Sequence, residues 1–196
     1  MRKLVYYVGV SLDGYIAGPG HEIDFFPFGD EKQTAEYMKW LPAHYPETIP
    51  SFARDQFGIA DAPNKRFDTL VMGRGTYVPG LDAGYTSPYA HLRQYVVSTT
   101  TPSDIDPAVT VVDSDPLGLV RELKKEEGGL DVWLCGGGRL AGALLPEIDE
   151  LVIKSYPVLA GAGIRVVDGE FSPTLFDVTD RVSFDSGITV TSFTRR

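Results

Sequence analysis

Short apolar runs rich in β-branched and aromatic residues alternate along the chain with segments that carry helix signals. The runs that read as buried strands are 3–10, 67–73, 93–100, 108–112, 131–135 and 150–159. Strands joined through helices pair in parallel and need helices on both faces of their sheet. The alternation therefore predicts an α/β protein with a mostly parallel sheet. Residues 175–196 alternate apolar and polar side chains around Asp-Ser-Gly, which predicts an antiparallel hairpin.

The segments between these runs contain start and stop signals for helices. Asp30 is a suitable N-cap for a helix over 31–41, which Pro42 is expected to end. The other expected helices are 74–81, 115–129 and 138–146, and 49–60 fits a further one. Residues 11–30 contain four glycines and two prolines, so they predict a long loop of the kind that is usually functional.

Length and composition suit one globular domain over residues 1–196, with 43% hydrophobic and 23% charged residues. No apolar run is long enough to cross a membrane, and the single Cys135 cannot form an internal disulfide, so a cytoplasmic protein is expected. A net charge of -9 without a basic cluster argues against nucleic-acid binding. The three histidines are isolated, and no metal site is predicted.

Three strand ends carry groups that suit a phosphate. Gly136, Gly137 and Gly138 stand between a strand and a helix, where missing Cβ atoms and free N–H groups admit an anion. Gly73 occupies the same kind of junction and is followed by Arg74 and Thr76, while the strand at 93–97 ends in Ser98 and Thr99. Ser98 and Thr99 could also simply cap a turn. A dinucleotide lying across the strand ends would use all three junctions.

Four segments, "VGVSLDGYIAG", "DTLVMGRGTY", "YVVSTT" and "VWLCGGGRLAGALLPEIDELVIKSYPVLAGAG", occur in the order and spacing of the dihydrofolate reductase superfamily. The chain most resembles the branch that contains the C-terminal reductase domain of the riboflavin-biosynthesis deaminase-reductase and its stand-alone bacterial relatives. The resemblance covers most of the chain and is least certain over 43–66. It implies a dihydrofolate-reductase-like three-layer fold around a mixed, eight-stranded sheet. It also implies an NADPH-dependent reductase, with a pterin or a 5-amino-6-(5-phosphoribosylamino)uracil-like pyrimidine as substrate, and a homodimer.

The same resemblance places NADPH on particular residues. By motif match, the expected cofactor contacts are Ile16, Ala17, Gly73, Arg74, Thr76, Ser98, Thr99, Gly136, Gly137, Gly138, Arg139 and Leu140. Ile16 and Ala17 would flank the nicotinamide, and the glycines would approach the pyrophosphate. Ser11 and Asp13 are candidates for the substrate side of this loop.

The proton donor is not identified by the resemblance. Folate-reducing members carry an acid behind a Trp-containing segment, and this chain lacks that Trp. Asp24, Asp30 and Glu31 compete for the position, although Asp30 also suits a helix cap. Cations for a phosphorylated ribose are available among scattered basic residues, and the candidates are Lys65, Arg66 and Arg93.

Other interpretations of these residues remain open. Phe25, Phe26, Phe28, Tyr37 and Trp40 could line a pocket for a flat ring or form ordinary core. Cys135 closes an apolar strand and is expected to be a buried, inert thiol. A hydrolase with Ser11 as nucleophile and a non-catalytic NADPH-binding protein are the alternative functions, although Asp13 occupies the glycine position of a nucleophile elbow.

Overall fold

The computed structural model describes residues 1–196. Its main strands are β1 (Leu4–Ser11), β3 (Phe67–Gly73), β4 (Arg93–Val97), β5 (Val109–Val112), β6 (Asp131–Gly136), β7 (Ile148–Tyr156), β9 (Phe176–Ser183) and β10 (Thr189–Arg195). They form one eight-stranded sheet in the order β5-β4-β3-β6-β1-β7-β10-β9. The first six pair in parallel, and the hairpin of β10 and β9 continues the sheet antiparallel to β7. The mostly parallel sheet and its terminal hairpin are therefore confirmed.

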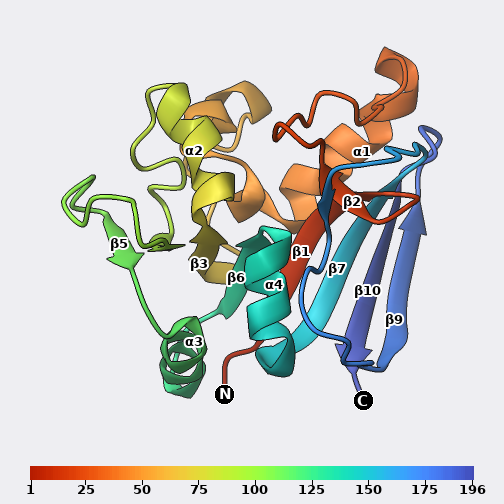
Figure 1. The fold of residues 1–196 in the computed structure, drawn as a ribbon. Coiled ribbons are helices and arrows are strands. Elements are labelled where there is room, and N and C mark those ends of the chain that lie inside the picture. The colour runs from red at the N-terminus through yellow and green to blue at the C-terminus, as the bar shows by residue number, and fades with distance from the viewer.

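Helices cover both faces of the sheet (Figure 1). They are α1 (Glu31–His44), α2 (Arg74–Asp82), α3 (Pro116–Lys125) and α4 (Gly138–Leu144). Tyr37 of α1 and Tyr77 of α2 are buried in the core on one face. Val120 of α3 and Leu144 of α4 are buried on the other. The central strands contribute side chains to the cores on both faces, so they are almost wholly buried. This is why they appear in the sequence as continuous apolar runs and could be predicted.

Two helix predictions were wrong. The first helix does not end at Pro42 but continues to His44, because the N–H of Tyr45 still donates to the carbonyl of Leu41 (2.8 Å). A proline removes only its own N–H donor, so the turn beyond it can close. The segment 49–60 forms no α-helix. It contains the 3₁₀ helix Ser51–Phe57, which ends at the left-handed Gly58.

Two buried charged side chains organise the segment 43–66. Glu47 is fully buried, and its carboxylate accepts the backbone N–H groups of Lys65 (3.2 Å), Arg66 (2.7 Å) and Phe67 (2.8 Å). Buried Arg54 donates to the carbonyls of Pro46 (2.8 Å) and Ala62 (2.6 Å). The segment is thus held by hydrogen bonds to the backbone, and it shows no hydrophobic period.

A second, two-stranded sheet joins the long loop to the segment after β7. It consists of β2 (Tyr15–Ala17) and β8 (Ile164–Arg165), which pair antiparallel. The N–H of Val166 donates to Gly14 (2.9 Å), and the hydroxyl of Tyr6 donates to the Val166 carbonyl (2.7 Å). This sheet was not predicted from the sequence.

The two ends of the parallel strands, which we call the carboxyl edge and the amino edge of the sheet, lie next to different parts of the chain. The carboxyl ends of the parallel strands, with the long loop and β2, lie at the top of Figure 1, and both chain termini lie at the bottom. None of the helices has the length and hydrophobicity needed to cross a membrane.

Candidate functional site

Two strand-to-helix junctions lie side by side at the carboxyl edge. Gly73 begins α2 and Gly137 begins α4, and neither N-cap offers a side-chain hydrogen bond to its helix. A Cβ built on Gly73 would lie 3.6 Å from the Gly136 carbonyl oxygen and 3.6 Å from the Gly137 nitrogen. Two helix starts without side-chain caps are therefore adjacent, and their N–H groups and dipoles favour an anion between them.

Each of the three consecutive glycines is required, or free of a side chain, for a different structural reason. Gly136 has a φ of 121°, which side chains rarely adopt. A Cβ on Gly138 would lie only 2.0 Å from the Arg165 carbonyl oxygen, so this glycine admits the crossing backbone. Gly137 has an ordinary, extended backbone (φ -87°, ψ -170°). A Cβ there would meet only two atoms, both at 3.9 Å: Ile16 Cδ1 and Thr76 Oγ1.

The space over Gly137 fits a phosphate group. Its absent side chain leaves room between Ile16 of β2 and Thr76 of α2. The Thr76 hydroxyl makes none of the protein's hydrogen bonds, and exposed Arg74 makes no ion pair. A hydroxyl donor and two uncapped helix starts form a cradle for an anion, and the free guanidinium of Arg74 stands beside it. We call Gly73, Thr76, Gly136 and Gly137 the glycine cradle.

The remaining residues of the two junctions contribute in other ways. Arg139 is 95% exposed in its side chain and lies 3.7 Å from the Asp168 carboxylate. Leu140 of α4 is buried in the core, and its Cβ lies 3.9 Å from the position of a Cβ built on Gly73. Ala17 is also buried and pairs with Ile164 of β8.

The third predicted junction lies next to the cradle, because Val97 of β4 is in register with Gly73. Ser98 follows it and is buried, and its hydroxyl oxygen accepts the N–H groups of Thr100 (3.2 Å) and Thr101 (3.0 Å). It therefore caps the turn, the other role considered for it. Thr99 is exposed.

Ser11 and Asp13 organise the loop that covers the cradle. The Ser11 hydroxyl donates to Asp13 Oδ1 (2.6 Å) and accepts the N–H of Tyr15 (2.9 Å). The Asp13 carboxylate also accepts the N–H groups of Ala160 (3.0 Å) and Gly161 (2.6 Å). The Ser11 hydroxyl and these N–H groups lower the pKa of Asp13 to about 2. The base in contact with Ser11 is the Asp13 carboxylate, whose low pKa makes it a weak one, so Ser11 lacks the strong base that activates a hydrolase nucleophile.

The three carboxylates considered as proton donors are exposed. Asp30 caps α1: its Oδ1 accepts the N–H of Gln33 (2.9 Å), and the Gln33 side chain accepts the N–H of Asp30 (3.0 Å). Glu31 lies in the first turn of the same helix, and Asp24 lies in the preceding loop. None of them makes a side-chain contact with the glycine cradle.

Most of the predicted aromatic group gathers around Tyr156, at the end of β7. Its ring centroid lies 4.8 Å from that of Phe26 and 5.7 Å from that of Phe28. The hydroxyls of Tyr156 and Tyr37 are 3.5 Å apart. Phe25 stacks on Phe26 at 4.4 Å. The long loop, α1 and β7 therefore meet in one aromatic cluster on the face of the sheet that carries α1.

Lys154 lies in the same region and was not singled out from the sequence. It is two residues before Tyr156 in β7, and its Nζ lies 4.4 Å from the ring centroid of Tyr7. Its amine has no hydrogen-bond or ion-pair partner, and burial lowers its pKa to about 8. A lysine within the apolar strand pattern of "ELVIKSY" was the signal that could have found it. Burial also raises the pKa of the neighbouring Cys135 to about 12, so its thiol is protonated and inert.

The three cations considered for a phosphorylated ribose do not join this site. Lys65 and Arg66 precede β3, and Arg93 begins β4, so they lie at the amino ends of these strands. Arg66 pairs with Asp131 (2.9 Å) and Glu150 (2.5 Å). Arg93 pairs with Glu126, and Glu126 also pairs with Arg2.

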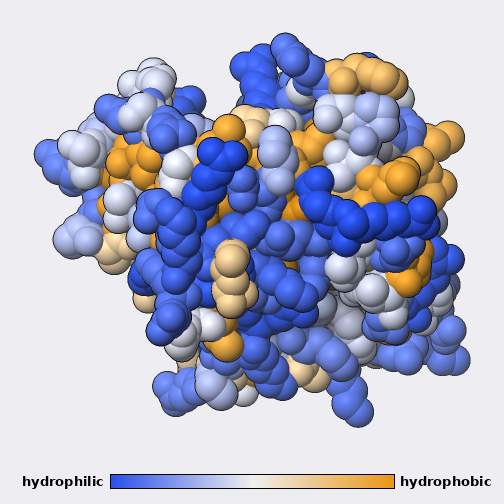
Figure 2. Space-filling view, turned by 90° about the horizontal axis from the view of Figure 1, so that it is seen from below, coloured by the Kyte–Doolittle hydropathy of each residue, from blue (hydrophilic) through white to orange (hydrophobic).

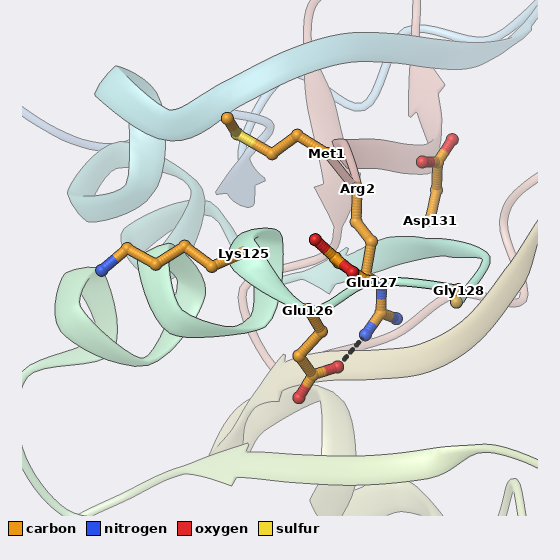
Figure 3. A pocket seen from close by; sticks show the side chains of 8 residues that line it. Met1, Arg2, Lys125, Glu126, Glu127, Gly128 and Asp131 are labelled. Atoms are coloured by element: carbon orange, nitrogen blue, oxygen red, sulfur yellow. Dashed lines mark hydrogen bonds and ion pairs between the residues drawn. The ribbon is translucent and has the colours of Figure 1, made fainter.

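A cavity of about 470 Å³ lies at that amino edge. It is lined by Met1, Arg2, Lys125, Glu126, Glu127, Gly128, Gly129 and Asp131. Figure 3 shows the Arg2 guanidinium turned toward Glu126, and it also donates to the Leu130 carbonyl (2.5 Å) and the Thr69 hydroxyl (2.7 Å). Seen from below in Figure 2, this edge is largely hydrophilic. Its central cation is fully paired, so the cavity reflects an ion network that ties the N-terminus to the sheet.

The sheet order and the paired glycine junctions define a protein of the dihydrofolate-reductase-like fold. Within that fold, the chain belongs to the family of the RibD C-terminal domain, whose model matches residues 2–190. The uncharacterized protein YwjB of Bacillus subtilis (strain 168) is 28% identical over 165 residues, covering 83% of this chain and 81% of that protein. The uncharacterized protein YyaP of the same strain is 25% identical over 194 residues, covering 93% and 85%.

Two solved structures share the fold. A protein from Shewanella sp. PV-4, provisionally named a riboflavin biosynthesis protein, superposes with a TM-score of 0.69 at 24% identity, covering 100% of this chain and 99% of that one. RibD of Acinetobacter baumannii gives a TM-score of 0.60 at 16% identity, and the chain spans 58% of its length. The predicted superfamily and fold are confirmed, and membership in this family supports a reductase-like role in the riboflavin pathway.

Proposed function

We propose that the protein is an NADPH-dependent reductase that transfers hydride to a small heterocycle, either a pterin or an aminouracil of the riboflavin pathway. The observation that carries the proposal is the glycine cradle, where two uncapped helix starts meet over an open Gly137. Such a cradle suits the pyrophosphate of a dinucleotide. The RibD C-terminal domain family supports a reductase.

The chain's residues would bind and orient the reactants. Thr76 and the N–H groups at the starts of α2 and α4 would hold the pyrophosphate. Ile16, which lies over the cradle, would press on one face of the nicotinamide. Ser11 and Asp13 would support this loop through their mutual hydrogen bond without touching the substrate. NADPH, when bound, supplies the hydride.

The function is tested by following NADPH oxidation with a panel of dihydropterins, aminouracil ribosides, their phosphates and simple carbonyl compounds. We expect turnover with one heterocyclic class and NADPH binding by calorimetry. Tight NADPH binding without oxidation of any compound would instead favour the non-catalytic binding protein. Absence of NADPH binding would contradict both.

Arg74→Ala is expected to weaken NADPH binding about tenfold or more and to leave NADH binding nearly unchanged. The Arg74 side chain is exposed and unpaired beside the cradle, so it is free to meet the 2′-phosphate. A charge-assisted hydrogen bond contributes about 1.5–3 kcal/mol, and about 1.4 kcal/mol is a factor of ten. Calorimetric titration with both cofactors measures the change, and rising salt should reduce the preference.

Arg121→Ala is the matched control for Arg74→Ala. It removes the same charge from α3, where Arg121 pairs with Glu147 (2.7 Å) on the other face of the sheet. Equal losses for NADPH and NADH in Arg74→Ala would show that Arg74 supports the turn and does not read the phosphate.

We also propose a homodimer formed through β9, the edge strand. Its side chains are mostly exposed, including Val178 at 55%. β9 pairs with β10 on one side only, so its other backbone edge is open to pair with β9 of a second copy. We expect sedimentation at micromolar concentration to show a dimer. A monomeric wild-type protein would contradict the proposal.

A further inference from the structure

The hydride acceptor needs a proton, and the structure contains one cation positioned to supply it. β7 residues alternate between the two faces of the sheet, so Lys154 shares a face with Val152 and Tyr156. This face carries α1 and the aromatic cluster around Tyr156. Cys135 packs against the same core and directly precedes Gly136 of the glycine cradle. Lys154 therefore shares its face of the sheet with the aromatic cluster and with Cys135, the residue before the cradle glycine Gly136.

The missing side chain of Gly9 makes room for the Tyr156 ring, and the Lys154 stem passes over the same glycine. A Cβ on Gly9 would lie 3.1 Å from the Tyr156 ring and 4.0 Å from Lys154 Cε. The lysine stem therefore crosses the sheet over Gly9, and its Nζ rests above the Tyr7 ring. It has no hydrogen-bond acceptor there. Lys154 is half-buried, and holding a cation in largely apolar surroundings without a protein partner costs stability, which a role in function would explain.

We propose that Lys154 is the proton donor of the reaction and touches the substrate atom that accepts the proton; this rests on the reductase function. The electron-poor carbon of a C=N or C=O bond receives the hydride from reduced nicotinamide, which becomes NADP⁺. An N–H bond of the Lys154 ammonium breaks, and its proton passes to the nitrogen or oxygen of the reduced bond. The neutral amine then takes a proton from water.

The groups around Lys154 suit this role because none of them carries a charge that would hold Lys154 in its protonated form. Those that face it are Tyr7 of β1, Cys135 of β6 and Tyr156 of β7, with Tyr37 of α1 behind. Burial raises the pKa of each, so all remain neutral near pH 8. The facing residue of β10, Val190, is apolar. With a pKa of about 8, Lys154 is mostly protonated at pH 7 yet gives up its proton readily.

The first measurement uses the protein without any ligand. Trinitrobenzenesulfonate reacts with neutral amines, and the modified lysines are identified by peptide mass spectrometry between pH 6 and 10. We expect Lys154 to react with an apparent pKa near 8, and exposed Lys125 serves as the internal comparison for reagent access. An unreactive Lys154, or one with an ordinary pKa, would overturn its role as donor.

The second measurement uses Lys154→Met, which keeps the length of the stem, and Lys125→Met as the matched control on α3. With the heterocycle that supports turnover, we expect kcat/KM of Lys154→Met to fall about 100-fold or more. The decline of the wild-type rate above pH 8 should disappear, and the NADPH affinity should stay unchanged.

The outcomes separate the two proposals. An active protein in which Lys154→Met keeps its rate and pH profile would overturn the donor role alone. A reactive Lys154 in a protein that oxidises NADPH with no compound of the panel would overturn the reductase function, and the donor role with it.

Discussion

Gly137→Val is expected to abolish measurable NADPH binding while the protein stays folded. The valine side chain would fill the space between Ile16 and Thr76, which are 3.9 Å from the site of the new Cβ. Losing two charge-assisted hydrogen bonds to phosphate, at about 1.5–3 kcal/mol each, costs about 3 kcal/mol or more, which weakens binding more than about 100-fold. The φ of Gly137 (-87°) lies in the extended region, which β-branched residues populate.

Gly138→Ala provides the contrast to Gly137→Val at the neighbouring position. Its Cβ would overlap the Arg165 carbonyl oxygen at 2.0 Å, so the crossing segment must shift. We expect it to lower the free energy of unfolding by about 1–3 kcal/mol. Thermal unfolding and NADPH calorimetry on both variants measure the difference. Unchanged NADPH affinity in a folded Gly137→Val protein would contradict the phosphate cradle.

Glu47→Ala should cause a large loss of stability, because the Glu47 side chain is fully buried. It would leave the N–H groups of Lys65, Arg66 and Phe67 buried without their carboxylate acceptor. Each unsatisfied donor costs about 1–3 kcal/mol, so the free energy of unfolding should fall by about 3 kcal/mol or more. For a protein of this size, the melting temperature should drop by about 6–12 °C.

Two further variants serve as controls for Glu47→Ala. Glu47→Gln keeps one carbonyl oxygen as an acceptor and should lose less than the alanine variant. Glu36→Ala, on the exposed side of α1, should change the unfolding free energy by less than about 0.5 kcal/mol. A Glu47→Ala protein as stable as Glu36→Ala would show that the three N–H groups find other acceptors.

The parts of the fold that could be predicted are those with a local pattern. Buried parallel strands are continuous apolar runs, and the final hairpin alternates around a turn in which Gly187 has a φ of 82°. The segment 43–66 could not be predicted, because its order comes from Glu47 reaching the start of β3. The small sheet pairs Tyr15 with Arg165, and nothing local to either residue indicates that contact.

The site divides in the same way. That Gly73 and Gly136 would be neighbours follows from the rule that parallel strands end at one edge, and the structure places them together. The need for glycine at position 138 could not be predicted, because it comes from the Arg165 backbone crossing over α4, and the sequence spacing does not reveal that contact. Lys154 was missed because its isolation depends on Gly9 and Tyr7 of another strand. The contacts of NADPH itself stay a prediction.

The position of the two termini has a practical consequence. Both lie at the edge of the sheet opposite the glycine cradle (Figure 1). An affinity tag, a fluorescent reporter or a surface-immobilisation anchor attached to either end would therefore stand away from the edge that carries the glycine cradle. Binding sensors for this protein can accordingly be built at either end of the chain without obstructing access.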